Sequence, residues 1–285
     1  MLVSRSSLLS SLSAMLLPGL LALSGGGIAA AALDAPSAQA APATAAVDLA
    51  PYRAIYSMKF GTMRSGGTTA DARGAMYIEM AEACDGWTAT QRVKLSMTNV
   101  QGDDEDSDSN YSSWESKDGR NYRFTVRNLR DGKLSEEYRG EASLGANAGA
   151  GKATFAAPTG VDVDLPKASV FPTEHVVQLI EAARAGSRQF SRVIFDGASL
   201  DGPFDVNAII GAQAKGKGGD KLLAGPSWPV RMAFFPLQSQ AAAPVYEVGV
   251  QLYENGIAQS FLLDYGGFTV VADLEKIEAL PKPRC

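Results

Sequence analysis

The chain has 285 residues, and its 31 Asp and Glu exceed its 26 Lys and Arg, which gives a formal net charge of −5 at pH 7. This acidic balance argues against nucleic acid or anionic lipid as a partner. Hydrophobic residues make up 46% of the chain, a share that is ordinary for a globular core.

Residues 1–40 have the pattern of a secretory signal peptide. Arg5 gives a weakly positive start, an uncharged stretch rich in Leu, Ala, Ser and Gly follows, and Ala38-Gln39-Ala40 supplies an A-x-A cleavage pattern. Pro18 and the glycines at 25–27 interrupt the apolar stretch, which disfavours a membrane anchor. We therefore expect cleavage near Ala40 and export of a soluble product to the periplasm.

The rest of the chain divides into a short leader and one folded part. Residues 41–49 are rich in Ala, Pro and Thr, so we expect a disordered leader there and a single β-rich domain over 50–285. All-β barrels and sandwiches often reach this size as one unit. Strand patterns on both sides of the one predicted helix favour a single domain over two.

Alternation with a period of two predicts antiparallel strands through most of this domain. Val93, Leu95 and Met97 alternate with polar residues, and so do Tyr122, Phe124 and Val126. Turn dipeptides separate the runs at Asp118-Gly119, Asp131-Gly132, Asn255-Gly256 and Gly266-Gly267. The predicted neighbours are Tyr111–Lys117 with Arg120–Asn128, that strand with Lys133–Arg139, and Val245–Glu254 with Ile257–Asp264, continuing into Phe268–Ala272. The glycine-rich segments Gly145–Gly151 and Lys215–Gly219 are predicted loops.

One segment, residues 171–186, has helical instead of strand periodicity. Thr173 is predicted to cap the first turn, and Gly186 to end the helix. Val176, Ile180 and Ala183 share one face, so the segment is predicted to be a short amphipathic helix that packs on the sheet.

Candidate catalytic and metal-binding residues are few. His175 is the only histidine, and without supporting motif spacing we interpret it as a surface or half-buried residue at the helix start. The acidic run 103–108 lacks the glycine and glutamate of a calcium loop and is interpreted as a solvated loop between strands. Asp162 and Asp164 are interpreted as residues of an exposed strand edge. We predict no catalytic residue, no metal site and no cofactor.

The two cysteines, Cys84 and Cys285, are predicted to form one disulfide, because thiol pairs in exported chains are usually oxidised. The bridge would tie the last residue to the early part of the folded domain. A redox thiol pair is the alternative, but C-x-x-C spacing is missing.

Several short motifs, in order along the chain, resemble the EipB-type cell-envelope-integrity family. They are Ala83-Cys84-Asp85-Gly86-Trp87, Gln91-Arg92, Trp114-Glu115-Ser116, Asp118-Gly119, Phe171-Pro172-Thr173-Glu174-His175, Phe195-Asp196-Gly197 and Leu280-Pro281-Lys282-Pro283-Arg284-Cys285. The resemblance implies a monomeric periplasmic protein folded as a large open, spiral or barrel-like antiparallel β-sheet, with a disulfide between Cys84 and Cys285. It also implies a role in envelope integrity under stress, together with a periplasmic tetratricopeptide-repeat protein.

Two classes of function remain open. The first is a non-enzymatic protein that maintains the envelope by binding a partner such as the tetratricopeptide-repeat protein. The alternative is a lipid or lipoprotein carrier, because a curved sheet with a helix across it can shelter an acyl chain. An apolar, unfilled cavity on the concave face would favour the carrier, and a packed core with an exposed apolar patch would favour the partner-binding protein.

Overall fold

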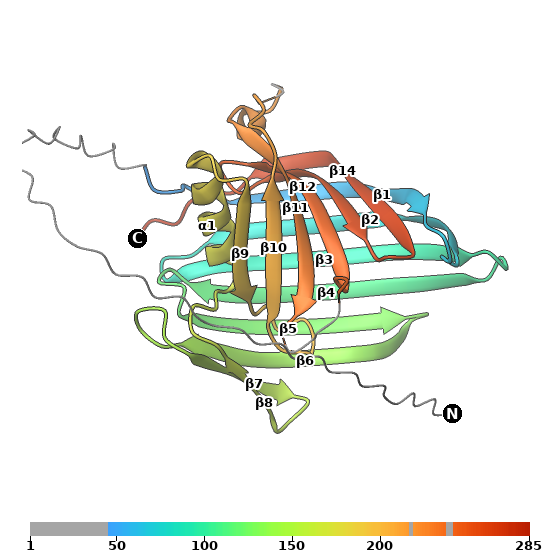
Figure 1. Cartoon of the computed structure of the whole chain (residues 1–285), viewed down its shortest axis with the longest axis horizontal. Coiled ribbons are helices and arrows are strands. Elements are labelled where there is room, and N and C mark those ends of the chain that lie inside the picture. Colours follow the sequence, from blue (N-terminus) through green and yellow to red (C-terminus); the bar gives the residue numbers. More distant parts are fainter. Residues whose placement is uncertain (1–44, 217–218, 238–241) are drawn as a thin grey trace, which may run out of the picture. The chain divides into compact units, whose positions relative to one another are not determined.

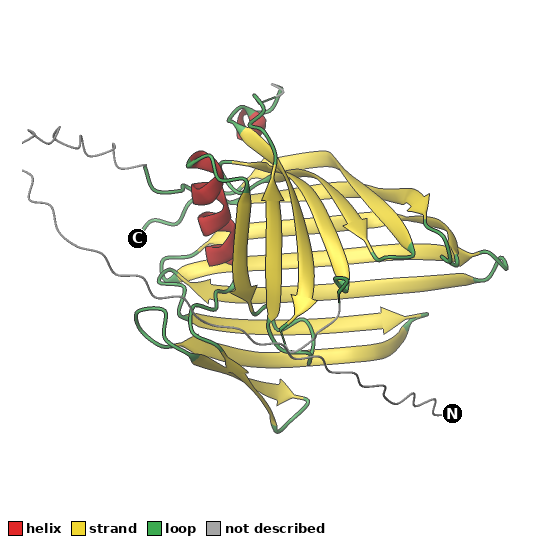
Figure 2. Cartoon of the chain, in the orientation of Figure 1, coloured by secondary structure: helices red, strands yellow, loops and turns green. Residues whose placement is uncertain are grey.

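The computed structural model describes residues 45–216, 219–237 and 242–285. Strands dominate this part of the chain, and one α-helix, α1 (Pro172–Arg184), accompanies them (Figure 2). The predicted signal peptide lies outside the described residues. The strands are β1 (Tyr52–Met63), β2 (Thr69–Glu82), β3 (Gly86–Asn99), β4 (Asp104–Ser116), β5 (Asn121–Arg130), β6 (Lys133–Leu144), β7 (Gly151–Ala157), β8 (Val161–Leu165), β9 (Gln189–Ile194), β10 (Phe204–Ile210), β11 (Ser227–Pro236), β12 (Tyr246–Tyr253), β13 (Ala258–Asp264) and β14 (Phe268–Ala279).

All fourteen strands form one sheet in the order β8-β7-β6-β5-β4-β3-β2-β1-β14-β13-β12-β11-β10-β9. The first and last strands pair at its centre, and the two edge strands, β8 and β9, are joined by the segment that contains α1. Figure 1 shows β9 to β12 crossing in front of the long strands β3 to β6, so the sheet curls and one of its faces becomes an interior. This confirms the predicted open, barrel-like antiparallel sheet with one helix.

The predicted hairpins are confirmed strand by strand. Tyr111 pairs with Val126 across β4 and β5, and Val126 pairs with Tyr138 across β5 and β6. Strand β12 pairs with β13, and β13 pairs with β14. The turn at Asp131-Gly132 behaves as its sequence predicts, because both residues take a positive φ, of 50° and 71°.

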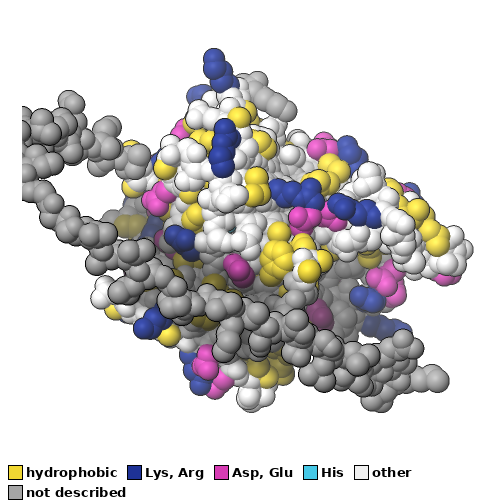
Figure 3. All heavy atoms as spheres, in the orientation of Figure 1, with side chains coloured by type: hydrophobic (Ala, Val, Ile, Leu, Met, Phe, Trp, Pro, Cys, Tyr) yellow, Lys and Arg dark blue, Asp and Glu magenta, His cyan; other side chains and the backbone are white. Residues whose placement is uncertain are grey.

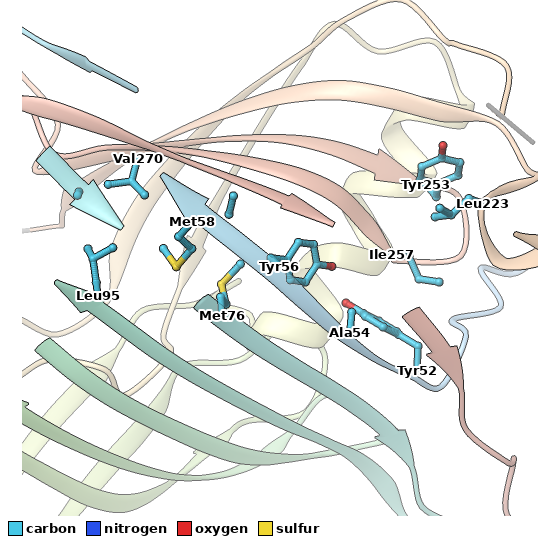
Figure 4. Close-up of a cluster of buried hydrophobic side chains, with 12 residues drawn as sticks. Tyr52, Ala54, Tyr56, Met58, Met76, Leu95, Leu223, Tyr253, Ile257 and Val270 are labelled. Carbon is cyan, nitrogen blue, oxygen red and sulfur yellow. The ribbon is translucent and has the colours of Figure 1, made fainter. Parts of the chain in front are cut away.

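The core near the centre of the sheet brings both halves of the chain together. Tyr56 and Met58 of β1 are buried with Tyr253 at the end of β12 and with Ile257 in the turn that follows it (Figure 4). The Tyr56 hydroxyl donates a hydrogen bond of 2.7 Å to the carbonyl oxygen of Ala258. Burial of each large apolar side chain contributes about 1.5–3 kcal/mol, so this cluster holds the curl of the sheet closed on one side.

Among the described residues, packing includes part of the segment 45–49, which the sequence assigns to a leader. Leu49 is 5% exposed and packs with Leu179 and Ile180 of α1. Val47 joins the same cluster, and the backbone N–H of Ala50 donates to the carbonyl oxygen of Asn255. The alternation of Val47 and Leu49 around Asp48 is a short strand-like pattern that the Ala and Pro content of the segment obscures.

The acidic run is not a loop, which corrects the prediction: residues 104–108 belong to β4. Asp104 and Asp106 lie opposite Thr98 and Ser96 of β3, and both accept hydrogen bonds from them, at 2.7 and 2.5 Å. Because alternate residues share a face, the aspartates collect on one side of the sheet beside polar partners. Cross-strand pairing therefore compensates a charge density that in isolation disfavours a strand.

The two predicted loops lie between strands. Residues 145–150 connect β6 and β7, and the described residues of Lys215–Gly219 lie outside the strands, while residues 217 and 218 lie outside the described part. Within the described ranges, no helix combines the length and the apolar character that crossing a bilayer requires.

Candidate functional site: a cavity between the two halves of the sheet

A cavity of about 650 Å³ lies inside the curled sheet. One wall comes from β1 to β4, the opposite wall from β11 to β13, and α1 lies against both. Most of the lining is apolar, for example Met76, Val93 and Leu95 on the first wall, Leu179 on the helix, and Val250 and Phe261 on the second wall. Alternation in the sequence predicts one buried face for the strands that contain Val93, Leu95 and Val250, but pairing between distant strands decides that these residues surround a space.

The helix that covers this cavity is positioned by Glu115 of β4. The Glu115 carboxylate accepts hydrogen bonds from the backbone N–H groups of Thr173 and Glu174, at 2.7 and 2.9 Å. Phe171 occupies the N-cap position without a side-chain cap bond, and Thr173 lies inside the first turn, so the predicted Thr173 cap is wrong. A carboxylate at a helix N-terminus satisfies otherwise unpaired N–H groups and complements the helix dipole.

Glu115 performs this role while 2% exposed. Burial raises its pKa to about 7, and the two hydrogen bonds from the helix oppose that shift. Both carboxylate oxygens are occupied by the helix, so Glu115 serves to place α1 over the cavity.

His175 lines the cavity and is 5% exposed, which corrects its interpretation as a surface or half-buried residue. Because α1 begins at Pro172, His175 falls on the same face as Leu179, one turn later, and both turn toward the sheet. Burial lowers the pKa of His175 to about 4, and the nearby Arg192 contributes. Its Nε2 atom has no hydrogen-bond partner among the described residues. The ring packs near Phe190, with centroids 5.6 Å apart.

The polar part of the lining includes two carboxylates that arginines hold. Asp264, 4% exposed, receives Arg64 and Arg231, the latter at 3.2 Å. Arg231 also pairs with Glu247, which lies beside Asp264 in the register of β12 and β13. The negative charges of Asp264 and Glu247 are therefore compensated by arginines that are not themselves part of the lining.

A third carboxylate, Asp196, lies in the loop between β9 and β10 and also lines the cavity. Its backbone carbonyl oxygen accepts hydrogen bonds from the hydroxyls of Tyr111 and Tyr122, each at 3.2 Å, so the loop is anchored to β4 and β5. Its Oδ1 accepts from the N–H of Ala198 at 2.9 Å, and burial raises its pKa. An Asp-Gly pair is typical of an ordinary turn, so the sequence by itself assigns no chemistry to Asp196.

The cysteines meet at one end of the sheet. The Cα atoms of Cys84 and Cys285 are 5.7 Å apart and their Sγ atoms are at bonding distance, so the pair is capable of a disulfide. The C-terminal segment runs beside the start of β1, where the N–H of Leu280 donates to Pro51 and Lys282 pairs with Asp48 at 2.6 Å. The pair therefore lies outside the lining of the cavity.

Asp162 and Asp164 lie on β8, an edge strand, and both are exposed, as predicted. Asp162 pairs with Lys152 of β7 at 2.7 Å. Over the described residues, no three His, Cys, Asp or Glu side chains gather into a group that could hold a metal ion. On the face drawn in Figure 3, charged side chains of both signs are interspersed with hydrophobic ones.

The chain is similar to known proteins in both sequence and structure. The model of a family described as EipB-like matches residues 43–281. A protein named cell envelope integrity protein EipB, from Brucella abortus, is 30% identical over 252 residues, which cover 85% of this chain and 88% of the relative. A crystal structure of a beta-barrel-like protein with a domain of unknown function, also from Brucella abortus, is similar with a TM-score of 0.77 at 27% identity. The structural match covers 83% of this chain and 100% of the chain in that crystal structure.

Proposed function

The chain belongs to the EipB-like family, and from this premise we propose that it supports cell envelope integrity by binding the apolar part of an envelope molecule in its cavity. The observation that carries this proposal is the cavity of about 650 Å³ with mainly apolar walls inside the curled sheet. Small-molecule sites are typically pockets of about 300–1,000 Å³ with predominantly apolar linings. Of the two functions left open by the sequence, this observation favours the lipid or lipoprotein carrier.

The proposal includes a non-enzymatic role, and the two buried groups best placed for acid–base chemistry support it. His175 has a pKa of about 4, so it is neutral near pH 7 and too weak a base for efficient proton abstraction there. Glu115 has a pKa of about 7, but the backbone of α1 occupies both of its carboxylate oxygens. Glu115 thus has a structural role, and His175 is a weak base near pH 7.

Periplasmic location is part of the same proposal. The predicted signal peptide over residues 1–40 supports it, as does the disulfide-capable pair Cys84 and Cys285, because the periplasm is an oxidising compartment. A carrier in that compartment would shield acyl chains from water between membranes, which is where their exposed apolar surface is most unfavourable.

The test is mass spectrometry of what co-purifies with the protein from its native envelope, scored for lipids and for proteins. We expect a lipid or an acylated protein, and we expect its loss in Val93→Trp, which fills the cavity. Lys94→Trp is the matched control, because Lys94 is the next residue of β3 and its side chain is 80% exposed. Recovery of a tetratricopeptide-repeat protein, without lipid and equally from both variants, would favour the partner-binding alternative instead.

A further inference from the structure

We propose that the cavity selects an amphiphile whose head group carries a protonated amine, and that the carboxylate of Asp196 binds this ammonium group. The inference rests on the proposed function, in which the apolar walls hold the chain of the same molecule. It adds the chemical class of the head group and the residue that recognises it.

The charges around the cavity are strongly one-sided. Among the described lining residues there are three carboxylates, those of Asp196, Glu247 and Asp264, and there is no lysine or arginine. Phosphate and carboxylate head groups are usually bound by Arg or Lys. A fatty acid or a phosphate head group would therefore find no lysine or arginine in this lining, whereas an ammonium group would find a carboxylate.

Two of the three carboxylates are already paired with cations of the protein. Arg231 contacts both Glu247 and Asp264, and Arg64 contacts Asp264 as well. These ion pairs compensate the negative charges of Glu247 and Asp264. They therefore leave Asp196 as the acid in the lining that has no arginine or lysine within salt-bridge range among the described residues.

Asp196 is fixed in place, but the negative charge of its carboxylate is only partly compensated by hydrogen bonds. The hydroxyls of Tyr111 and Tyr122 hold its backbone carbonyl, and the N–H of Ala198 donates to its Oδ1 at 2.9 Å. No hydrogen bond from the described residues reaches its Oδ2. Asp196 is half-buried, and a carboxylate that is partly withdrawn from water is unfavourable without a cation or enough donors, so burial raises its pKa.

The surroundings of Asp196 suit a head group at the polar end of an amphiphile. Ser107 and Ser109 of β4 and Tyr246 of β12 line the cavity together with Asp196, whereas Met76, Val93 and Phe261 line it with apolar surface. Burial and the neighbouring Asp196 carboxylate raise the pKa of Tyr246, so the Tyr246 hydroxyl lies near enough to accept a further N–H bond of an ammonium group that Asp196 binds. The same cavity thus offers a place for a chain and a place for its amine.

The test uses three probes with the same alkyl chain: dodecylamine, dodecanol and dodecanoate. Their binding to the purified mature protein is measured at pH 7 by titration calorimetry, below the solubility limit and any micelle concentration of each probe. We expect the amine to bind about tenfold more tightly than the alcohol, which is the gain expected of one hydrogen-bonded ion pair. We expect the carboxylate to bind most weakly. Equal binding of amine and alcohol would overturn the proposed role of Asp196 and leave the carrier function intact, whereas binding of none of the three would overturn the carrier function itself.

The variant Asp196→Asn keeps the Oδ1 acceptor for Ala198, so the loop should retain its conformation. It should bind the amine and the alcohol equally, with the affinity for the alcohol unchanged. Asp201→Asn is the matched control, because Asp201 is an exposed acid in the same loop and should keep the tenfold preference. Retention of the amine preference in a folded Asp196→Asn protein would contradict the assignment. If this variant fails to fold, the relative affinities of the wild type for the amine and the alcohol still test the proposal.

Discussion

The carboxylate of Glu115 accepts the backbone N–H of Thr173 at 2.7 Å, across 58 positions of the sequence. The strand β4 thereby sets where α1 begins, and α1 in turn covers the cavity. We expect Glu115→Ala to lower the free energy of unfolding by about 1–3 kcal/mol, because the first turn loses its cap and buries unpaired N–H groups. Chemical denaturation measures this loss. Glu137→Ala, an exposed glutamate of β6, is the control and should change the stability by less than about 0.5 kcal/mol.

Ionisation of Glu115 should lower stability as the pH rises. Its folded-state pKa of about 7 lies above the model value of 4.5, so the folded protein holds this proton more tightly than the unfolded chain does. The stabilisation is present below pH 4.5 and is lost as the pH rises through about 7. Glu115→Gln should lack this trend, so the difference in unfolding free energy between wild type and variant, measured in urea, should change between pH 4.5 and 7.5. A difference that does not vary over this range would contradict the raised pKa.

His175 should have the opposite effect in the same pH range. Its folded-state pKa of about 4 lies below the model value of 6.5, so the unfolded chain takes up the proton first. The stabilisation from neutral His175 is present above pH 6.5 and is lost as the pH falls toward 4. We expect His175→Gln to be destabilised at pH 7 but to lose less further stability than the wild type between pH 6.5 and 4.5. Melting temperatures over this range test the prediction, and parallel curves would refute it.

The His175→Gln protein also tests the absence of an enzymatic role. If His175 is a buried neighbour of the cavity and not a base, the variant should complement envelope stress in a strain that lacks the gene. Its abundance in the periplasmic fraction must match that of the wild type. A folded, equally abundant variant that fails to complement, yet still binds the amphiphile probes, would make an enzymatic reading the better one.

Cys84 and Cys285 are expected to be oxidised in the mature protein. Denaturation without reductant should leave both unreactive toward a thiol-labelling reagent, and reduction should expose both. In the chain-entropy model, a bridge with a sequence separation of 201 contributes at most about 5 kcal/mol, so Cys285→Ser should lower the melting temperature. The ion pair of Lys282 with Asp48 alone should not keep the C-terminal segment resistant to protease. Labelling of either cysteine before reduction would exclude the bridge.

Local patterns in the sequence predicted many of the strands and turns, but not residues 104–108 of β4. The alternation at Tyr122, Phe124 and Val126 follows from the two-residue period of a strand, and all three are buried in the structure. Asp131-Gly132 accepts the positive φ that its hairpin requires. Such features depend on residues that are neighbours in the chain, so one sequence suffices to predict them.

The site depended on contacts between distant residues, which a single sequence does not encode in any local pattern. Pairing of β1 with β14 and the curl of the sheet bring Val93 and Phe261 to opposite walls of one cavity. Glu115 reads as one more strand residue until Thr173 is known to lie beside it, and Asp196 reads as part of a turn until Tyr111 and Tyr122 hold it at the cavity. Short-range propensities thus determined the elements, whereas the closure of the sheet, through burial of side chains from both ends of the chain, decided which of them surround a space.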